Sequence, residues 1–228
     1  MNASRRILMC PPDHYGIEYE INPWMDRRTG AEPDRACRQW QALHDALRDL
    51  GVVVERLDPV AGLPDLVFTA NAGLVYRDTF VSSRFRHGER QGETPLFERR
   101  AHELGLRVVT LPPGYHFEGA GDALFCGETL YGGYRFRSAA RSHLWIGHLL
   151  GIEVLPLELA DPRFYHLDTC FCPLDDGAAI YYPGAFDDYG RAVLRRRIKC
   201  LTLRLDGEEA AAWKRIPEAP DAPIRATA

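Results

Sequence analysis

The sequence predicts an α/β fold assembled from a repeated unit of hairpin, helix and strand. Segments that begin at Phe68, Phe117 and Tyr165 share one pattern: a polar start, an apolar strand, a turn with Asp or Gly, a second strand and a closing aromatic residue. They recur about every 49 residues, a period typical of repeated supersecondary units. Helical patterns and short β-branched runs separate them. Because one unit alone cannot bury its apolar faces, the units are expected to share a core.

Four units can be traced along the chain. The first is the least regular: its helix has the sequence DRACRQWQALHDALRDLG, and the strand VVVERL follows. The next three helices are predicted at 92–104, 138–150 and 186–197, from polar caps and apolar residues three or four apart. The strands RVVTLP and IEVLPL follow the first two of them. This alternation favours helices on the outside and strands lining a centre.

The polar residues that open each hairpin are the candidates for a functional site. Side chains alternate along a strand, so His166 and Asp168 are predicted to share one strand face. If the units form a ring, the polar starts of the hairpins converge on one axis. The converging set is Asn71, Glu118, Asp122, His166 and Asp168.

The fourth unit ends differently from the others. Earlier joins between helix and strand contain Gly51, Gly105 and Gly151. The segment RAVLRRRIKCLTLRL, residues 191–205, must make the same change without Gly, Pro, Asn, Asp or Ser, which are the usual residues of such a break. The sequence therefore predicts that something is missing at this junction.

Charge and hydropathy narrow the class of partner. The chain has 28 basic and 32 acidic residues, with one short basic run at 195–197, which disfavours nucleic acid as a partner. It has neither a signal-peptide pattern nor an apolar stretch of about 20 residues, so we expect a cytoplasmic protein without a membrane span. A small molecule is the expected partner.

The six cysteines do not predict a metal site. They are scattered, and the spacing of Cys170 and Cys172 is not that of a structural zinc site. Five of them are predicted to be small, buried, inert residues: Cys10, Cys37, Cys126, Cys170 and Cys172.

The remaining cysteine suggests a reaction. Cys200 lies in the alternating strand KCLTLRL, and a thiolate is a strong nucleophile that a nearby histidine can assist. Buried carboxylates are costly unless they meet a cation, so Glu118, Asp122 and Asp168 favour a planar cationic substrate such as a guanidinium.

Five motifs carry a more specific resemblance. FTANAGLVY, FEGAGDALF, GGYRFRS, HLDTCFCPL and KCLTLRLDG, in this order, resemble the guanidine-modifying enzymes, which include arginine deiminase, dimethylarginine dimethylaminohydrolase and glycine amidinotransferase. The resemblance extends from Arg5 to Gly207. It implies a pentein-type α/β propeller of five ββαβ units around a central site. It also implies a reaction without a cofactor, in which a cysteine displaces an amine from the guanidinium carbon and the adduct passes to water or to an acceptor amine.

The resemblance also implies roles for single residues. Cys200 corresponds to the nucleophile, His166 to the general acid and base, and Glu118 to the carboxylate that binds the guanidinium and orients the site. Asp168 corresponds to a residue that holds substrate nitrogens. Arg137 corresponds to the arginine that grips a substrate carboxylate, which implies an amino-acid substrate.

Two departures from the family pattern affect the interpretation. Asn71 stands where deiminases commonly have an aspartate, and a related asparagine occurs in dihydrolases, which remove both terminal nitrogens. Relatives also have a further strand, hairpin and helix between VLRRR and the cysteine motif. The resemblance therefore implies an incomplete propeller of about four traceable repeats, whose open strand edge could drive homo-oligomerisation.

We accordingly expect one catalytic α/β-propeller domain at 1–207 and a disordered tail at 208–228. The predicted function is hydrolysis of a guanidinium C–N bond in arginine or an arginine derivative, of the deiminase, dihydrolase or dimethylaminohydrolase type. Two alternatives stay open. One is an amidinotransferase, and the other is an inactive remnant that binds cationic amino acids.

Overall fold

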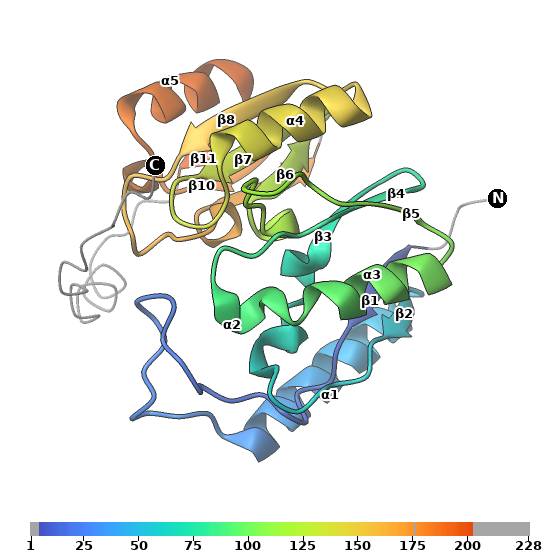
Figure 1. The fold of residues 1–228 in the computed structure, drawn as a ribbon. Helices are drawn as coiled ribbons and strands as arrows, with labels where there is room; N and C mark the ends of the chain where they lie inside the picture. Colours follow the sequence, from blue (N-terminus) through green and yellow to red (C-terminus); the bar gives the residue numbers. More distant parts are fainter. Residues whose placement is uncertain (1–4, 176, 203–228) are drawn as a thin grey trace.

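The computed structural model describes residues 5–175 and 177–202, with only the backbone at Asp175 and at 200–202. The predicted tail, 208–228, lies outside the described residues. Four small sheets, with helices outside them, make up the described chain (Figure 1). Within this part of the chain, none of the helices has both the length and the apolarity to cross a membrane.

The elements follow the predicted order. The first unit contains β1 (Arg6–Met9), α1 (Pro33–Asp49) and β2 (Val53–Arg56). The second contains β3 (Gly73–Tyr76), β4 (Thr79–Ser82), the short α2 (Gly88–Gln91), α3 (Thr94–Glu103) and β5 (Arg107–Val109). The third contains β6 (Ala123–Cys126), β7 (Thr129–Tyr134), α4 (Ala140–Leu150) and β8 (Val154–Glu158). The fourth contains β9 (Phe171–Asp175), β10 (Ala178–Tyr181), α5 (Asp188–Arg197) and β11 (Lys199–Thr202).

The last three units share one topology. Each hairpin is antiparallel, and its second strand pairs in parallel with the strand that follows the helix. The orders are β3-β4-β5, β6-β7-β8 and β9-β10-β11, whereas β1 and β2 form a parallel two-stranded sheet. The predicted α/β repeat of hairpin, helix and strand is confirmed in these units.

The junction between α5 and β11 differs from the other joins between helix and strand. Gly51, Gly105 and Gly151 follow their helices with positive φ angles of 76°, 81° and 65°, the conformation that glycine adopts most readily. After α5, only Ile198 separates the helix from β11, and it is extended, with φ −125° and ψ 139°. The cysteine motif thus begins in the third strand of the fourth sheet.

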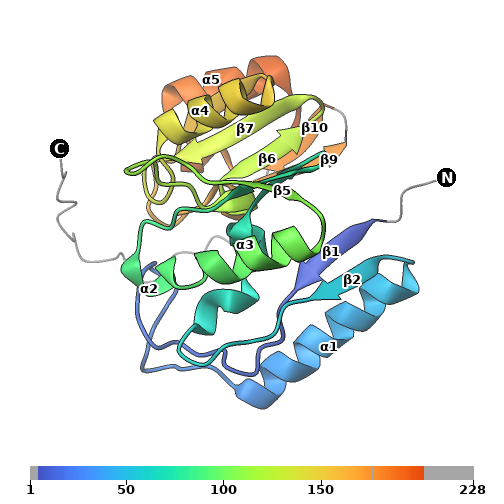
Figure 2. The ribbon, with the colours of Figure 1, turned by 45° about the vertical axis from the view of Figure 1, so that its right-hand side comes forward.

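The core lies between the sheets and the helices. Figure 2 shows α1 at the lower edge of the molecule and α4 and α5 at the upper edge, with strands between them. Antiparallel bridges join neighbouring units at Arg84 with Phe117 and at Leu159 with Phe186. Phe117 and Phe186 are fully buried, and each aromatic side chain removed from water contributes about 1.5–3 kcal/mol. Apolar packing therefore continues from one unit to the next.

Candidate functional site

Short 3-10 turns, not strands, contain or flank the polar residues that open each hairpin. They are η2 (Thr69–Ala72), η3 (Gly119–Gly121) and η4 (Leu167–Thr169), and they meet where the last three units come together. The prediction that His166 and Asp168 share a strand face is wrong. His166 precedes η4, Asp168 lies within it, and the strand begins only at Phe171. Because the chain turns here, His166 is buried and Asp168 is exposed.

Two glycines of the FEGAGD motif allow these turns to touch. Gly119 has a φ of +61°, and a Cβ atom there would lie 2.7 Å from the carbonyl oxygen of Ala70. A Cβ atom on Gly121 would collide with Asn71 Nδ2 and would lie 3.3 Å from His166 Nδ1. The absence of side chains thus brings η2 and η3 into backbone contact.

His166 lies between two buried carboxylates. Its Nε2 atom is 3.4 Å from Glu118 Oε2, and its Nδ1 atom is 3.1 Å from Asp122 Oδ1. Glu118 also accepts hydrogen bonds from Arg137 Nη1 at 3.0 Å and from the Arg86 backbone N–H at 3.1 Å. Glu118 and Asp122 are fully buried, and His166 is 4% exposed. The arrangement can hold the imidazole in one orientation.

Asp122 is held in its ionised form. Burial alone would raise its pKa, but the nearby His166 and the hydrogen bond from Ser138 Oγ, 2.6 Å long, lower the pKa below its ordinary value. The other carboxylate oxygen accepts the Leu167 backbone N–H at 3.2 Å. Charge-assisted bonds of this kind offset the desolvation of a buried carboxylate.

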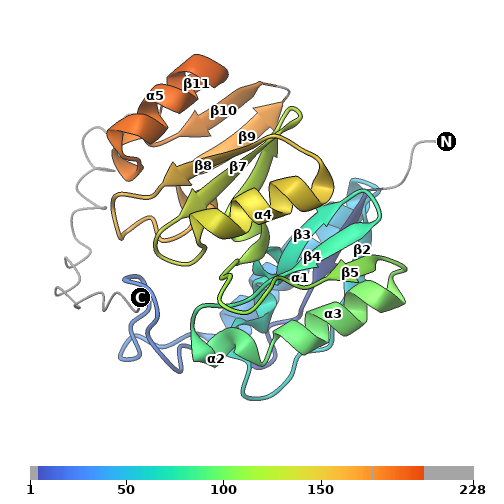
Figure 3. The same ribbon diagram turned by 45° about the horizontal axis from the view of Figure 1, so that its top comes forward.

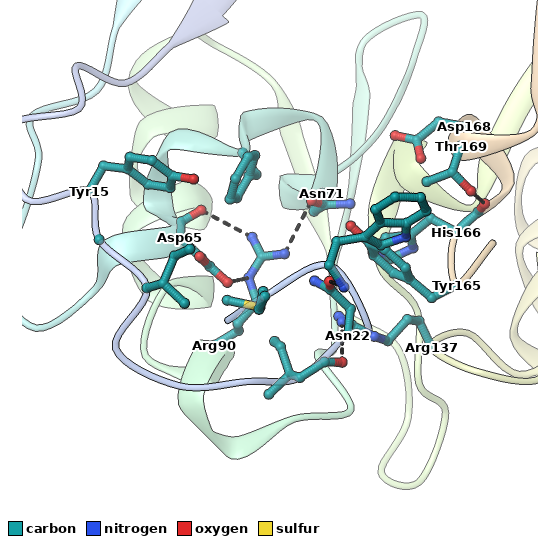
Figure 4. A pocket seen from close by; sticks show the side chains of 16 residues that line it. Tyr15, Asn22, Asp65, Asn71, Arg90, Arg137, Tyr165, His166, Asp168 and Thr169 are labelled. Carbon is teal, nitrogen blue, oxygen red and sulfur yellow. Dashed lines mark hydrogen bonds and ion pairs between the residues drawn. The ribbon is translucent and has the colours of Figure 1, made fainter. Parts of the chain in front are cut away.

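A cavity of about 410 Å³ opens beside His166. His166, Asp168, Asn71 and Arg137 line it, whereas Glu118 and Asp122 lie behind His166 and do not. Figure 4 shows Asp65 and Arg90 on one side of the cavity and Tyr165, His166 and Asp168 on the other, with Asn71 between. The structure therefore groups six of the seven predicted site residues: Asn71, Glu118, Asp122, Arg137, His166 and Asp168.

Arg137, the residue predicted to bind the substrate carboxylate, already makes contacts within the protein. Arg137 donates from Nη1 to Glu118 and from Nη2 to the Ile21 carbonyl oxygen at 2.8 Å, and its guanidinium lies 5.0 Å from the centre of the Tyr165 ring. The bond to Ile21 ties the long loop between β1 and α1 to the site. Loop residues such as Trp24 close one side of the cavity.

Asp168 has a pKa above the ordinary value of an aspartate. It is open to solvent at the cavity mouth, yet it is recessed among protein atoms. Desolvation therefore raises its pKa to about 6, against an opposing effect of the nearby His166. The charge of the cavity wall thus changes near this pH.

The sequence interpretation missed a second buried network. Arg90 binds Glu93 with two bonds of 2.8 Å, donates to Asn71 Oδ1 at 3.1 Å and lies 3.8 Å from Asp65 Oδ2. Burial raises the pKa of Asp65, whose Oδ1 atom has no hydrogen-bond partner in the described part of the chain. The signal that could have found Asp65 is its position in the apolar stretch LPDLVF, where an acid is unusual.

Comparisons with known proteins decide the family. No protein-family model matches the chain. The bifunctional arginine dihydrolase/ornithine cyclodeaminase AgrE of Nostoc sp. (strain PCC 7120) is 51% identical over 201 residues, 87% of this chain. A dimethylarginine dimethylaminohydrolase of Mycobacterium tuberculosis is 44% identical over 80% of the chain. The crystal structure of the substrate-bound N-terminal domain of ArgZ, a cyanobacterial arginine dihydrolase, matches with a TM-score of 0.83 and 49% identity over 87% of this chain and 75% of that one.

This chain belongs to the guanidine-modifying enzyme superfamily. Its fold is accordingly the α/β pentein fold. The chain spans only 28% of the length of AgrE and 60% of the mycobacterial relative. Family membership and fold are thus settled for the part that matches.

Cys200, the predicted nucleophile, lies in β11. The Cys200 backbone pairs in register with Ala179 of β10, but its side chain lies outside the described residues.

Burial raises the pKa of the Cys10 thiol to about 12 and also raises that of Cys170, so neither forms a thiolate near neutral pH. The prediction that Cys37 and Cys172 are buried is wrong, because both are exposed. Cys172 alternates with the buried Phe171 along β9, as neighbours on a strand must.

Proposed function

We propose that the chain hydrolyses a guanidinium C–N bond of arginine or an arginine derivative through a covalent cysteine intermediate. One observation carries the proposal: the clamped His166 beside a cavity, in a chain 49% identical to a substrate-bound arginine dihydrolase domain. Five polar site residues gathered at three turns, together with Arg137 from the segment before α4, form a cluster that is mostly buried and is typical of a reaction centre.

In the proposed reaction, the Cys200 thiolate attacks the guanidinium carbon, and the C–S bond forms as the C=N electrons move to nitrogen. His166 gives a proton to the departing nitrogen, and the C–N bond breaks to release an amine. Water then adds to the same carbon and yields a proton to His166. The C–S bond breaks, which leaves a ureido product and restores the thiolate.

The remaining site residues have two kinds of role in this proposal. Glu118 and Asp122 act through His166, because each lies within 3.4 Å of the imidazole and neither lines the cavity. Asn71 and Asp168 line the cavity and bind the guanidinium nitrogens. Arg137 binds the substrate carboxylate, and its bond to Glu118 links that contact to His166.

The amide of Asn71 bears on the product. A deiminase releases one ammonia from arginine and leaves citrulline, whereas a dihydrolase adds two waters, releases two ammonia molecules and carbon dioxide, and leaves ornithine. Asn71 is neutral and can both donate and accept hydrogen bonds, so it suits a ureido group as well as a guanidinium. We therefore propose dihydrolase-type chemistry, tested by the ratio of ammonia to arginine consumed.

We also propose that the chain contains four units of a five-unit propeller, with one unit missing between α5 and β11. The single-residue junction at Ile198 and the 75% coverage of the ArgZ domain support this view. A second candidate function follows, that of a remnant that binds cationic amino acids without turnover. The strand register favours the remnant. Cys200 pairs with Ala179, two residues before β10 ends at Tyr181, which places the Cys200 backbone about 7 Å from the strand end near the cavity.

Acid-quenched mass spectrometry of the full chain with L-arginine separates the candidates. Hydrolysis predicts an adduct on Cys200 equal to arginine less ammonia, together with ammonia release, and neither in Cys200→Ser. An amidinotransferase predicts an adduct of the amidino group alone and a new guanidino product when glycine is added. Arginine binding by calorimetry without adduct or ammonia would establish the remnant and overturn the proposed hydrolysis.

A further inference from the structure

Ser138 has an unusual position for a serine that precedes a helix. Its place after Arg137 suggests a helix cap, but α4 is preceded by Ala139, and the Ser138 side chain is completely buried. The Ser138 hydroxyl accepts the Glu118 backbone N–H at 3.0 Å and donates to Asp122 Oδ2 at 2.6 Å. Because the Glu118 N–H occupies a lone pair of the Ser138 hydroxyl oxygen, the hydroxyl proton points to the Asp122 carboxylate.

This hydroxyl begins a chain of contacts that ends at His166. Asp122 receives Ser138 on Oδ2, while Oδ1 faces His166 Nδ1 at 3.1 Å and accepts the Leu167 N–H. All members lie in a nearly dry interior, where charged and polar groups at such distances interact strongly. The two oxygens of Asp122 are thus assigned to different partners.

We propose that Ser138 is a positioning residue for His166, which it orients by fixing the Asp122 carboxylate between η3 and η4. Without the hydroxyl, Asp122 Oδ2 loses its donor and the Glu118 N–H loses its acceptor, so the carboxylate is free to rotate away from the imidazole. The catalytic consequence rests on the proposed function, but the orientation of His166 does not.

The test compares Ser138→Ala with Ser142→Ala. Ser142 is a matched control, because it is also completely buried and its hydroxyl has no hydrogen-bond partner in the described part of the chain. Loss of a residue that orients a metal-binding histidine typically reduces metal affinity or activity about 10- to 100-fold, and a loss in this range is the expectation for a residue that orients His166. We expect that loss in kcat with Ser138→Ala, with KM for arginine changed less than about twofold, and wild-type kinetics with Ser142→Ala. Ser138→Cys, a weak donor of similar size, should recover part of the rate.

A second readout needs no turnover. The imidazole ¹⁵N resonances of His166, assigned by their loss in His166→Gln, should move in Ser138→Ala and stay in Ser142→Ala. Unchanged His166 resonances in a folded Ser138→Ala variant would overturn the proposal, as would equal losses of kcat in both alanine variants. If the wild-type chain releases no ammonia, the proposed hydrolysis fails, while the resonances still decide the role of Ser138.

Discussion

At the scale of single residues, the site depends on the absence of a side chain at Gly121. A Cβ atom there would collide with Asn71 Nδ2 and crowd His166 Nδ1. We expect Gly121→Ala to destabilise the fold by about 1–3 kcal/mol, as overpacking of a tight interior does. It should also lower kcat/KM about 100-fold, because small displacements of reacting groups are that costly.

Urea unfolding and steady-state kinetics measure these effects, with Gly88→Ala as the control. A Cβ atom on Gly88 would have open space around it, and Gly88 has no positive φ, so its substitution should change the free energy of unfolding by less than about 0.5 kcal/mol. Equal stability and activity in the two variants would mean that Gly121 does not set the spacing of Asn71 and His166.

The charge of Asp168 predicts a pH dependence of ligand binding. Desolvation raises its pKa to about 6, so the side chain is neutral below this pH and anionic above it. A cationic ligand should therefore bind more tightly as the pH rises from 5 to 7. Because Asp168 is exposed, we expect a gain of only about two- to fivefold, the range of a solvent-screened ion pair. Calorimetry with L-arginine measures it, and the same pH slope in Asp168→Asn would contradict this assignment.

At the scale of elements, helix α5 leads directly into the strand that carries Cys200. The helix begins with a side-chain cap, since Asp187 Oδ1 accepts the Gly190 N–H at 2.8 Å. We expect Asp187→Ala to cost about 1 kcal/mol of unfolding free energy, the usual value of such a cap. The neighbouring Asp188 side chain is 96% exposed, so Asp188→Ala is the matched control and should cost less than about 0.5 kcal/mol. If Asp188→Ala lowers the free energy of unfolding as much as Asp187→Ala does, the Asp187 cap is not the source of the stabilisation.

Helices and strands were predictable because their signals are local. Apolar periodicity placed α3, α4 and α5 within about two residues of their observed starts, and Gly51, Gly105 and Gly151 marked the joins. The 3-10 turns were not predictable, because contacts between units set them, such as the hydrogen bond from the Leu167 backbone N–H in η4 to Asp122 Oδ1 beside η3. A strand was predicted at HLD since alternation of side chains alone cannot reveal a turn.

The site was predictable in part. Six of the seven predicted site residues lie together, and the side chain of the seventh, Cys200, lies outside the described residues. Asp65 and Arg90 were missed because charged residues are usually exposed. The buried pairing of Arg90 with Glu93, spaced three apart, reads in the sequence as an ordinary surface pair of a helix. The loop at residues 15–25 has no periodic pattern, so only the folded chain reveals that it covers the cavity.

At the scale of the whole molecule, the first unit has the least support from strand pairing and side-chain burial. Figure 3 shows β1, β2 and α1 behind the elements of the second unit. Its sheet has two strands where the others have three, and none of the 17 residues of α1 is buried. Leu43 and Leu50 are 55% and 80% exposed. Two-stranded sheets are marginally stable, so local opening is expected to begin here.

Hydrogen exchange should therefore distinguish the first unit from the third. We expect amides of α1 and β2 to exchange at least about tenfold faster than those of β6, β7 and β8, because fewer buried contacts oppose their opening. Exchange monitored by mass spectrometry on peptides from 33–56 and 123–158 measures the difference. Protection of α1 and β2 that increases with protein concentration would indicate that a second copy covers this unit and would support the predicted homo-oligomer. Equal, concentration-independent protection of both regions would contradict the view that the first unit is the weakest part of the fold.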